Sequence, residues 1–181
     1  MLCLHKAQDF ALLFFVRNRP RILSYLYRSC AIDDCTFVLN QNMLAMEKYH
    51  IDRDIKVFCV TAVSFPLGVG GAFTKLLSFL PQPNNRLLYA ISRPNEKGEI
   101  IYKAAAEESF AGEGAKYGCE TFVIKKGEYW SEFLPDWRKD ESSVGKTFQQ
   151  LLKHPALDRN GYCLEIYPNE KDIRCLVPLI K

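Results

Sequence analysis

Two segments of this 181-residue chain resemble each other closely enough to constrain the fold more than any other feature. Val69–Leu77 (VGGAFTKLL) and Val144–Leu152 (VGKTFQQLL) match at five of nine positions. Pro94–Lys97 (PNEK) recurs as Pro168–Lys171, at a separation one position shorter than that of the first match. Two matches in the same order, at nearly equal separations, indicate an internal duplication whose two copies pack against each other.

Each copy is predicted to have the order strand–helix–strand–strand. β-Branched and aromatic residues indicate the strands, and apolar residues at helical spacing indicate the helices. In the first copy these elements are expected at Ile55–Phe65, Val69–Leu80, Leu87–Ile91 and Ile100–Ala105. In the second copy they are expected at Glu120–Phe133, Val144–Lys153, Tyr162–Tyr167 and Ile173–Leu179.

The repeats also predict the domain organisation. Residues 1–46 are expected to be an N-terminal extension, either poorly ordered or translated from an upstream start codon, with a docked helix as the alternative. Residues 47–181 are expected to form one domain, with repeat one at about 47–106, an exposed linker at about 107–118 and repeat two at about 119–181. The predicted fold class is α+β, with antiparallel sheets, helices packed against them and a cleft between the repeats.

Composition excludes several classes of protein. The 24 basic and 21 acidic residues leave a net charge of +3, which argues against direct nucleic-acid binding by bulk electrostatics. No apolar run reaches the roughly 18–20 residues of a membrane-spanning helix. The seven cysteines are odd in number and irregularly spaced, so we expect reduced core thiols and a cytoplasmic protein. Cysteine and histidine spacing predicts no metal site, and Gly68–Gly71 (GVGG) lacks the spacing of a nucleotide-binding loop, so no cofactor is expected.

Two segments carry a family resemblance. Gly118–Tyr129 (GCETFVIKKGEY) and Tyr162–Leu179 (YCLEIYPNEKDIRCLVPL), within the duplicated order, are similar to the GyrI-like small-molecule-binding family. The resemblance covers about Glu47 to Lys181. The family includes effector-binding domains of bacterial transcription activators and the gyrase-inhibitor protein. A few relatives resemble hydrolases of strained-ring compounds.

The resemblance implies a cleft in which a buried glutamate meets aromatic-faced, often cationic, organic ligands. Because no recognisable DNA-binding module accompanies the domain, direct transcriptional control is in doubt. The expected protein is a stand-alone binding domain for amphipathic or cationic organic molecules, acting as a regulator or a sequestering protein.

Glu165 is the strongest candidate ligand-binding residue. The spacing of the PNEK repeats places it opposite Ile91 of the first copy, so a carboxylate stands where the sister strand has an apolar residue. Burying a carboxylate without a partner is costly. We therefore expect its charge to be balanced either by a cationic ligand or by Arg174 on the neighbouring strand.

Aromatic residues complete the predicted site, because aromatic faces beside a carboxylate form a cage for a flat or cationic molecule. Tyr167 lies two residues after Glu165 and should share its strand face. The full predicted set is Glu165, Tyr167, Tyr89, Trp130 and Trp137.

Two alternatives to a binding domain remain open. One is a hydrolase in which Glu165 activates water as a general base. A second carboxylate or a tyrosine hydroxyl within reach of Glu165 would favour it. The other is a protein-interaction module resembling a gyrase inhibitor, which would expose an apolar patch instead of a closed cleft.

Overall fold

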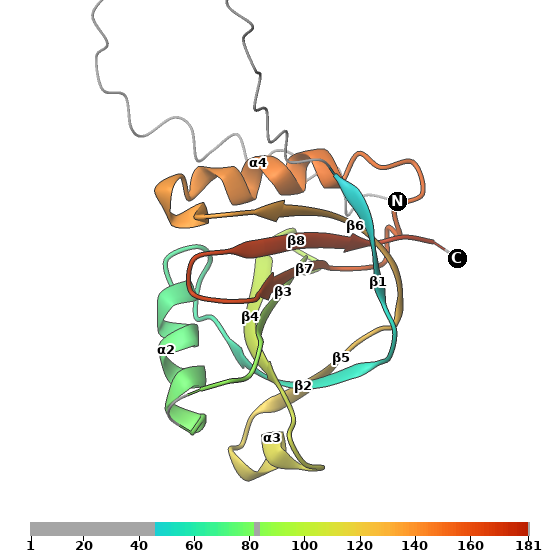
Figure 1. The fold of residues 1–181 in the computed structure, drawn as a ribbon. Helices are drawn as coiled ribbons and strands as arrows, with labels where there is room; N and C mark the ends of the chain where they lie inside the picture. The colour runs from blue at the N-terminus through green and yellow to red at the C-terminus, as the bar shows by residue number, and fades with distance from the viewer. Residues whose placement is uncertain (1–45, 82–83, 181) are drawn as a thin grey trace, which may run out of the picture.

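The computed structural model describes residues 46–81 and 84–180, which form an antiparallel sheet with helices on its outer face (Figure 1). The predictions for residues 1–45, including those for Cys3, Cys30 and Cys35, fall outside these residues. The first part of the described chain contains β1 (Glu47–Ile51), β2 (Ile55–Thr61), α2 (Val69–Phe79), β3 (Leu88–Pro94) and β4 (Ile100–Glu107). The second part contains α3 (Glu113–Lys116), β5 (Glu120–Ile124), β6 (Gly127–Leu134), the 3-10 turn η1 (Trp137–Lys139), α4 (Ser142–Leu151), β7 (Cys163–Tyr167) and β8 (Ile173–Pro178).

The eight strands form one sheet in the order β1-β6-β8-β7-β3-β4-β2-β5. β1 and β2 lie at or beside opposite ends of this order, yet only the short segment Asp52–Asp54 connects them. A connection of this length cannot cross the width of a flat sheet of eight strands. The sheet must therefore curl until its two ends approach each other, as Figure 1 shows. At the middle of the sheet, β3 pairs with β7, and Ala90 faces Glu165 across the pair.

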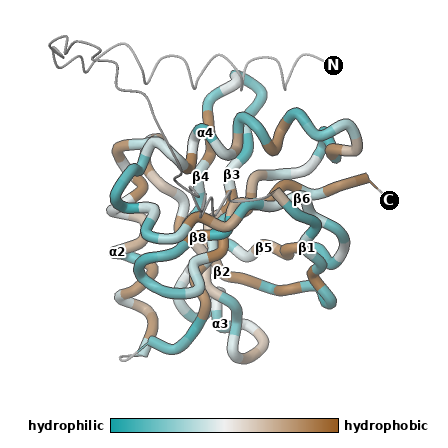
Figure 2. Tube along the Cα trace, turned by 45° about the horizontal axis from the view of Figure 1, so that its top comes forward, coloured by the Kyte–Doolittle hydropathy of each residue, from teal (hydrophilic) through white to brown (hydrophobic). Residues whose placement is uncertain are grey.

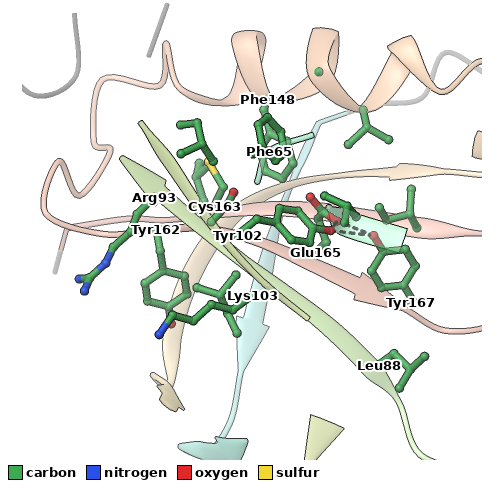
Figure 3. Close-up of a pocket in the computed structure, with 18 of the residues that line it drawn as sticks. Phe65, Leu88, Arg93, Tyr102, Lys103, Phe148, Tyr162, Cys163, Glu165 and Tyr167 are labelled. Atoms are coloured by element: carbon green, nitrogen blue, oxygen red, sulfur yellow. Dashed lines mark hydrogen bonds between the residues drawn. The ribbon is translucent and has the colours of Figure 1, made fainter. Parts of the chain in front are cut away.

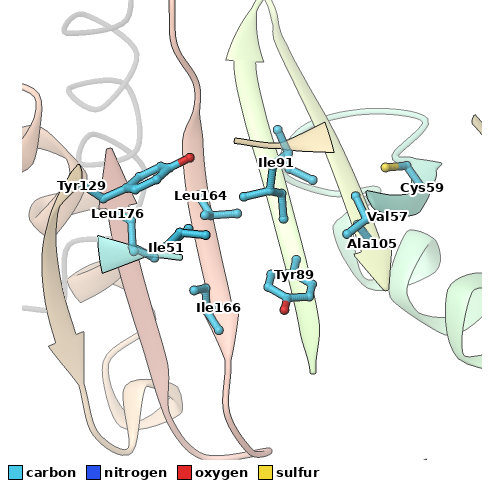
Figure 4. Close-up of a cluster of buried hydrophobic side chains, with 11 residues drawn as sticks. Ile51, Val57, Cys59, Tyr89, Ile91, Ala105, Tyr129, Leu164, Ile166 and Leu176 are labelled. Carbon is cyan, nitrogen blue, oxygen red and sulfur yellow. The ribbon is translucent and has the colours of Figure 1, made fainter. Parts of the chain in front are cut away.

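The inner face of the curl is an apolar core that draws residues from both ends of the sheet. It contains Ile51 of β1 and Leu164 of β7 (Figure 4), and also Ile124 of β5, all buried. The outer face carries α2 and α4, and the alternating colours along both helices in Figure 2 are those of helices with one apolar side. Ala72 and Leu76 of α2 pack on β2 and β4, and Leu151 of α4 packs on β6 and β8.

The two predicted helices and the two predicted hairpins are confirmed, with ends within a few residues of those expected. The prediction of one strand over Glu120–Phe133 is wrong. The strand is interrupted at Lys125 and Lys126, and the two strands on either side, β5 and β6, lie far apart in the strand order. Within residues 107–118, where an exposed linker is expected, Glu113 is only 1% exposed. No helix among the described residues is long and apolar enough to cross a membrane.

Candidate functional site

A broad open groove lies on the outer face of the sheet, with α2 on one side and α4 on the other. It belongs to a larger hollow of about 2520 Å³, which also reaches residues packed against the inner core, among them Phe122 and Tyr162. Phe73 of α2 and Phe148 of α4 line the two walls. Tyr102, Glu165 and Tyr167 line the floor (Figure 3). The groove therefore collects side chains from both halves of the domain around one carboxylate.

Glu165 is held by two tyrosine hydroxyls. Its side chain is on β7 and only 6% of the residue is exposed. Tyr102 of β4 donates a hydrogen bond to Oε2 at 2.7 Å, and Tyr167 donates to the same oxygen at 2.5 Å (Figure 3). The two hydroxyl oxygens are 3.3 Å apart. Within the described part of the chain, both hydrogen bonds to this carboxylate end on Oε2, so Oε1 is left for a ligand or water.

Burial dominates the electrostatics of this group. It raises the pKa of Glu165 above its ordinary value, although the hydrogen bonds from Tyr167 and Tyr102 limit the rise. Burial, and the negative charge of Glu165 beside them, raise the pKa values of Tyr102 and Tyr167 well above the usual range. The phenols therefore stay protonated and remain hydrogen-bond donors at neutral pH.

Arg174 does not neutralise Glu165, so this expectation is wrong. In the β7–β8 pair, Glu165 faces Cys175 and Arg174 faces Ile166, which points to the inner face. Because successive side chains of a strand alternate between faces, Arg174 lies on the opposite side of the sheet. There it contacts Glu47 at 2.7 Å and donates to Ser131 Oγ at 3.1 Å.

The predicted correspondence between Glu165 and Ile91 is also wrong. Glu165 pairs with Ala90 and shares its face, whereas Ile91 pairs with Leu164 and lies in the inner core. The separation between the two matched helices relates Glu165 to Ala90. The separation between the two PNEK segments is one residue shorter and therefore relates Glu165 to Ile91. A shift of one residue moves a strand side chain to the other face.

Tyr167 and Trp137 line the groove beside Glu165. The Tyr167 ring meets the edge of Phe73 at 5.3 Å and that of Trp137 at 6.1 Å, measured between ring centroids. On the other side, the ring of Phe65 stacks on Tyr102 at 5.7 Å. The two phenols are thus held by aromatic neighbours. The indole Nε1 of Trp137 is buried and has no hydrogen-bond partner among the described residues.

Tyr89 and Trp130 lie elsewhere, and their predicted place in the site is corrected. Tyr89 is 2% exposed and belongs to the inner core. Its neighbour in β3, Leu88, lines the groove, and adjacent side chains of a strand point to opposite faces. Trp130 packs in the core beneath α4, with its ring centroid 4.7 Å from that of His154. Neither lines the groove.

Several groove residues were not anticipated from the sequence, among them Phe65, Phe73, Tyr102 and Phe148. Phe73 and Phe148 are the same position of the two matched helices, so the repeat itself held a signal for them. Tyr102 alternates with Ala104 and Ala106 on one face of β4. The two alanines are fully buried beneath α2, so this local pattern does not indicate a groove. Only the pairing of β4 and β7 with β3 shows that Glu165 lies near Tyr102.

The described residues contain no cluster of three histidine, cysteine or acidic side chains that could hold a metal ion. Cys163 lines the groove, and its thiol pKa is raised to about 12 by burial and then by the charge of Glu165. In the described part of the chain Cys59, Cys119, Cys163 and Cys175 are free thiols.

Comparison with solved structures shows a shared fold. The chain is similar to SAV2435, solved bound to tetraphenylphosphonium, with a TM-score of 0.55, 8% identity, and coverage of 75% of this chain and 94% of that one. It is also similar to an integron cassette protein from the mobile metagenome of Vibrio cholerae, with a TM-score of 0.53, 10% identity, and coverage of 75% and 95%. No family model and no curated protein sequence matches the chain.

Proposed function

We propose that this protein binds amphipathic organic cations in the groove between α2 and α4, with Glu165 as the anionic anchor. The observation that carries the proposal is the state of Glu165. It is buried, two phenols orient one of its oxygens, and in the described part of the chain no cationic side chain pairs with it. A buried carboxylate without a counter-charge costs free energy that a cationic ligand would recover.

The groove walls suit the apolar part of such a ligand. Phe65, Phe73, Trp137 and Phe148 place aromatic surface around the carboxylate. Cation–π contacts contribute about 0.5–2 kcal/mol each, depending on how far the pair is desolvated. The neighbour SAV2435, which shares the fold, was solved with a lipophilic cation, and this supports the same ligand class here.

The arrangement of elements supports the predicted duplication and its cleft. Exchanging β1 to β4 for β5 to β8 leaves the strand order unchanged when it is read from the other end. α2 follows β2 as α4 follows β6. Each proposed repeat would then supply one wall of the groove and one of its two central strands. GyrI-like membership, a cytoplasmic location and a protein partner remain predictions.

A thermal-shift titration tests the proposed function. Tetraphenylphosphonium is the cationic probe, and triphenylphosphine oxide is a neutral probe of similar bulk. A ligand that binds only the folded state raises the melting temperature with concentration. We expect the cation to raise it and the neutral compound to raise it much less. Equal shifts, or none with the cation, would contradict a cation site.

The hydrolase alternative is favoured by one observation, the two tyrosine hydroxyls within reach of Glu165. In that reaction Glu165 would take a proton from water as its oxygen attacks an electrophilic carbon. The bond from that carbon to its leaving atom would break, and Tyr102 or Tyr167 would protonate the leaving atom. The phenol would recover its proton from Glu165, so the net reaction is addition of water.

This alternative is tested by incubating the protein with a strained-ring electrophile and measuring its consumption from the fall in its absorbance. Tyr102→Phe and Glu165→Gln should each slow consumption at least tenfold if the reaction occurs at this site. The matched control is Tyr129→Phe, which removes a buried hydroxyl that is bonded to Lys125 and Tyr162 instead. If the protein binds the compound but consumes it no faster than buffer does, the hydrolase alternative is wrong and the protein only binds its ligand.

A further inference from the structure

The residues shared by the two helices are concentrated on the walls of the groove. The five identities between Val69–Leu77 and Val144–Leu152 are at Val69/Val144, Gly70/Gly145, Phe73/Phe148, Leu76/Leu151 and Leu77/Leu152. Four of these five pairs line the groove, and only the Leu76/Leu151 pair packs wholly beneath its helix. The similarity of α2 and α4 is therefore greatest where they face the groove.

Gly70 and Gly145 are the unexpected members of this set. Glycine inside a helix is destabilising relative to alanine, so two equivalent helix glycines require an explanation. Two reasons are common: a backbone with positive φ, or a neighbouring atom too close to admit a Cβ. Neither glycine has positive φ. A Cβ built at either position meets no described atom within 4 Å.

Gly71 provides a contrast within the same helix. A Cβ there also meets no described atom within 4 Å, but Gly71 does not line the groove. Its counterpart in α4 is Lys146, a large side chain that does line the groove. The two helices therefore differ at this position, whereas Gly70 and Gly145 both line the groove and are both glycine. Among the described residues, no contact within either helix's packing accounts for these two glycines, and the space beside them opens on the groove.

We infer that Gly70 and Gly145 set the width of the groove and select ligands by bulk. This inference rests on the proposed function and specifies its ligand class: organic cations with large apolar groups on both sides of the charge, broad enough to reach α2 and α4 together. A small cation such as tetramethylammonium would contact Glu165 but leave both walls unfilled. With side chains at positions 70 and 145, the groove would admit only narrower molecules.

Substitution at the two glycines, with Gly71 as the matched control, tests the inference. Gly70→Ala, Gly145→Ala and Gly71→Ala should all fold and melt at an equal or slightly higher temperature, by about 1–4 °C. The leucine series Gly70→Leu, Gly145→Leu and Gly71→Leu then adds bulk at the same positions. Affinities for tetraethylphosphonium, tetraphenylphosphonium and triphenylphosphine oxide are measured by isothermal titration.

Leucine at position 70 or 145 should weaken tetraphenylphosphonium binding about tenfold or more, because its side chain would occupy space at the groove wall that a broad ligand needs. Tetraethylphosphonium should lose less than about threefold, and Gly71→Leu should change neither affinity beyond that. If Gly70→Leu and Gly145→Leu bind tetraphenylphosphonium with the affinity of the native protein, the inference is overturned. If the leucine variants misfold, the same comparison on the alanine series, with a smaller loss in the same order, decides it.

Failure of the proposed function is distinguishable from failure of this inference. If the native protein binds triphenylphosphine oxide as tightly as the cation, the cation site is wrong, but selection by bulk is still measured on the neutral probe. If the native protein binds none of the three probes, both proposals are overturned.

Discussion

Glu165 is a carboxyl group whose pKa is raised by its environment, and a bound cation would favour its charged form. It is buried in the sheet, its pKa is raised by burial, and its hydrogen-bond donors are neutral phenols. Between its pKa in the unfolded chain and its higher pKa in the folded chain, the folded state binds more protons. Glu165 therefore lowers stability as pH rises through that interval.

The variant Glu165→Gln should remove this dependence. At pH 4 we expect it to unfold with nearly the same free energy as the native protein. Near pH 7 to 8 we expect it to be more stable, on the order of 1 kcal/mol, because the amide avoids burying a charge. Urea melts across this pH range provide the measurement. Glu96→Gln, at an exposed carboxylate that lines the groove, is the control and should change the free energy of unfolding at pH 7 by less than about 0.5 kcal/mol. A variant less stable than the native protein at pH 7 would show that the carboxylate is structural.

Among the elements, α3 shows how a short segment is held without a large apolar face. Glu113 accepts hydrogen bonds from Arg86 at 2.9 Å and from the backbone N–H of Ser109 at 2.7 Å. Burial raises the pKa of Glu113, but the bonds from Ser109 and Arg86 lower it by more, so the net shift is downward. The carboxylate ties α3 to the loop before β3.

Glu113→Gln should therefore destabilise the protein by about 1–3 kcal/mol at pH 7, because it weakens a buried charged hydrogen-bond network. Because the folded pKa is depressed, this contribution is present above the unfolded value, 4.5, and is lost as pH falls through the folded pKa. The gap between variant and native protein should narrow below about pH 4.5. The control Glu107→Gln removes a more exposed partner of Arg53 and should cost less than about 1 kcal/mol. Equal losses in the two variants would contradict this account of α3.

Local patterns in the sequence predicted α2, α4 and both hairpins, because helical spacing and short apolar runs are properties of neighbouring residues. They did not predict the break at Lys125 and Lys126, because β5 and β6 acquire their places only by pairing with β2, β1 and β8. In the site, the sequence indicated Glu165 as an unusual buried acid. It misplaced Tyr89 by one strand position and missed Tyr102, since strand register across the sheet decides which side chains share a face.

At the scale of the whole molecule, the curl of the sheet buries one face and leaves the other for two separate helices. α2 and α4 each cover their own part of that outer face, and the paired strands β3 and β7 form the floor between them. The groove is therefore a consequence of how the sheet is covered. Its walls and floor come from elements of the described domain.

We therefore predict that residues 46–181 alone retain the fold and the ligand site. The shortened chain should melt within about 2 °C of the full chain and bind tetraphenylphosphonium within about threefold. Differential scanning fluorimetry with and without the ligand measures both. Loss of cooperative melting, or of binding alone, would show that residues 1–45 contribute to the domain or to its site.

The central claim is that the charge of Glu165 binds a cation in the groove. Isothermal titration of native protein, Glu165→Gln and the control Glu96→Gln with tetraphenylphosphonium and triphenylphosphine oxide tests it most directly. The account predicts that Glu165→Gln weakens cation binding about tenfold or more, about 1.4 kcal/mol, because it removes the Coulomb attraction between the buried carboxylate and the phosphonium charge. The affinity for the neutral compound should change much less in Glu165→Gln. Glu96→Gln should change the affinity for neither compound. Unchanged cation affinity in a folded Glu165→Gln variant would contradict the claim.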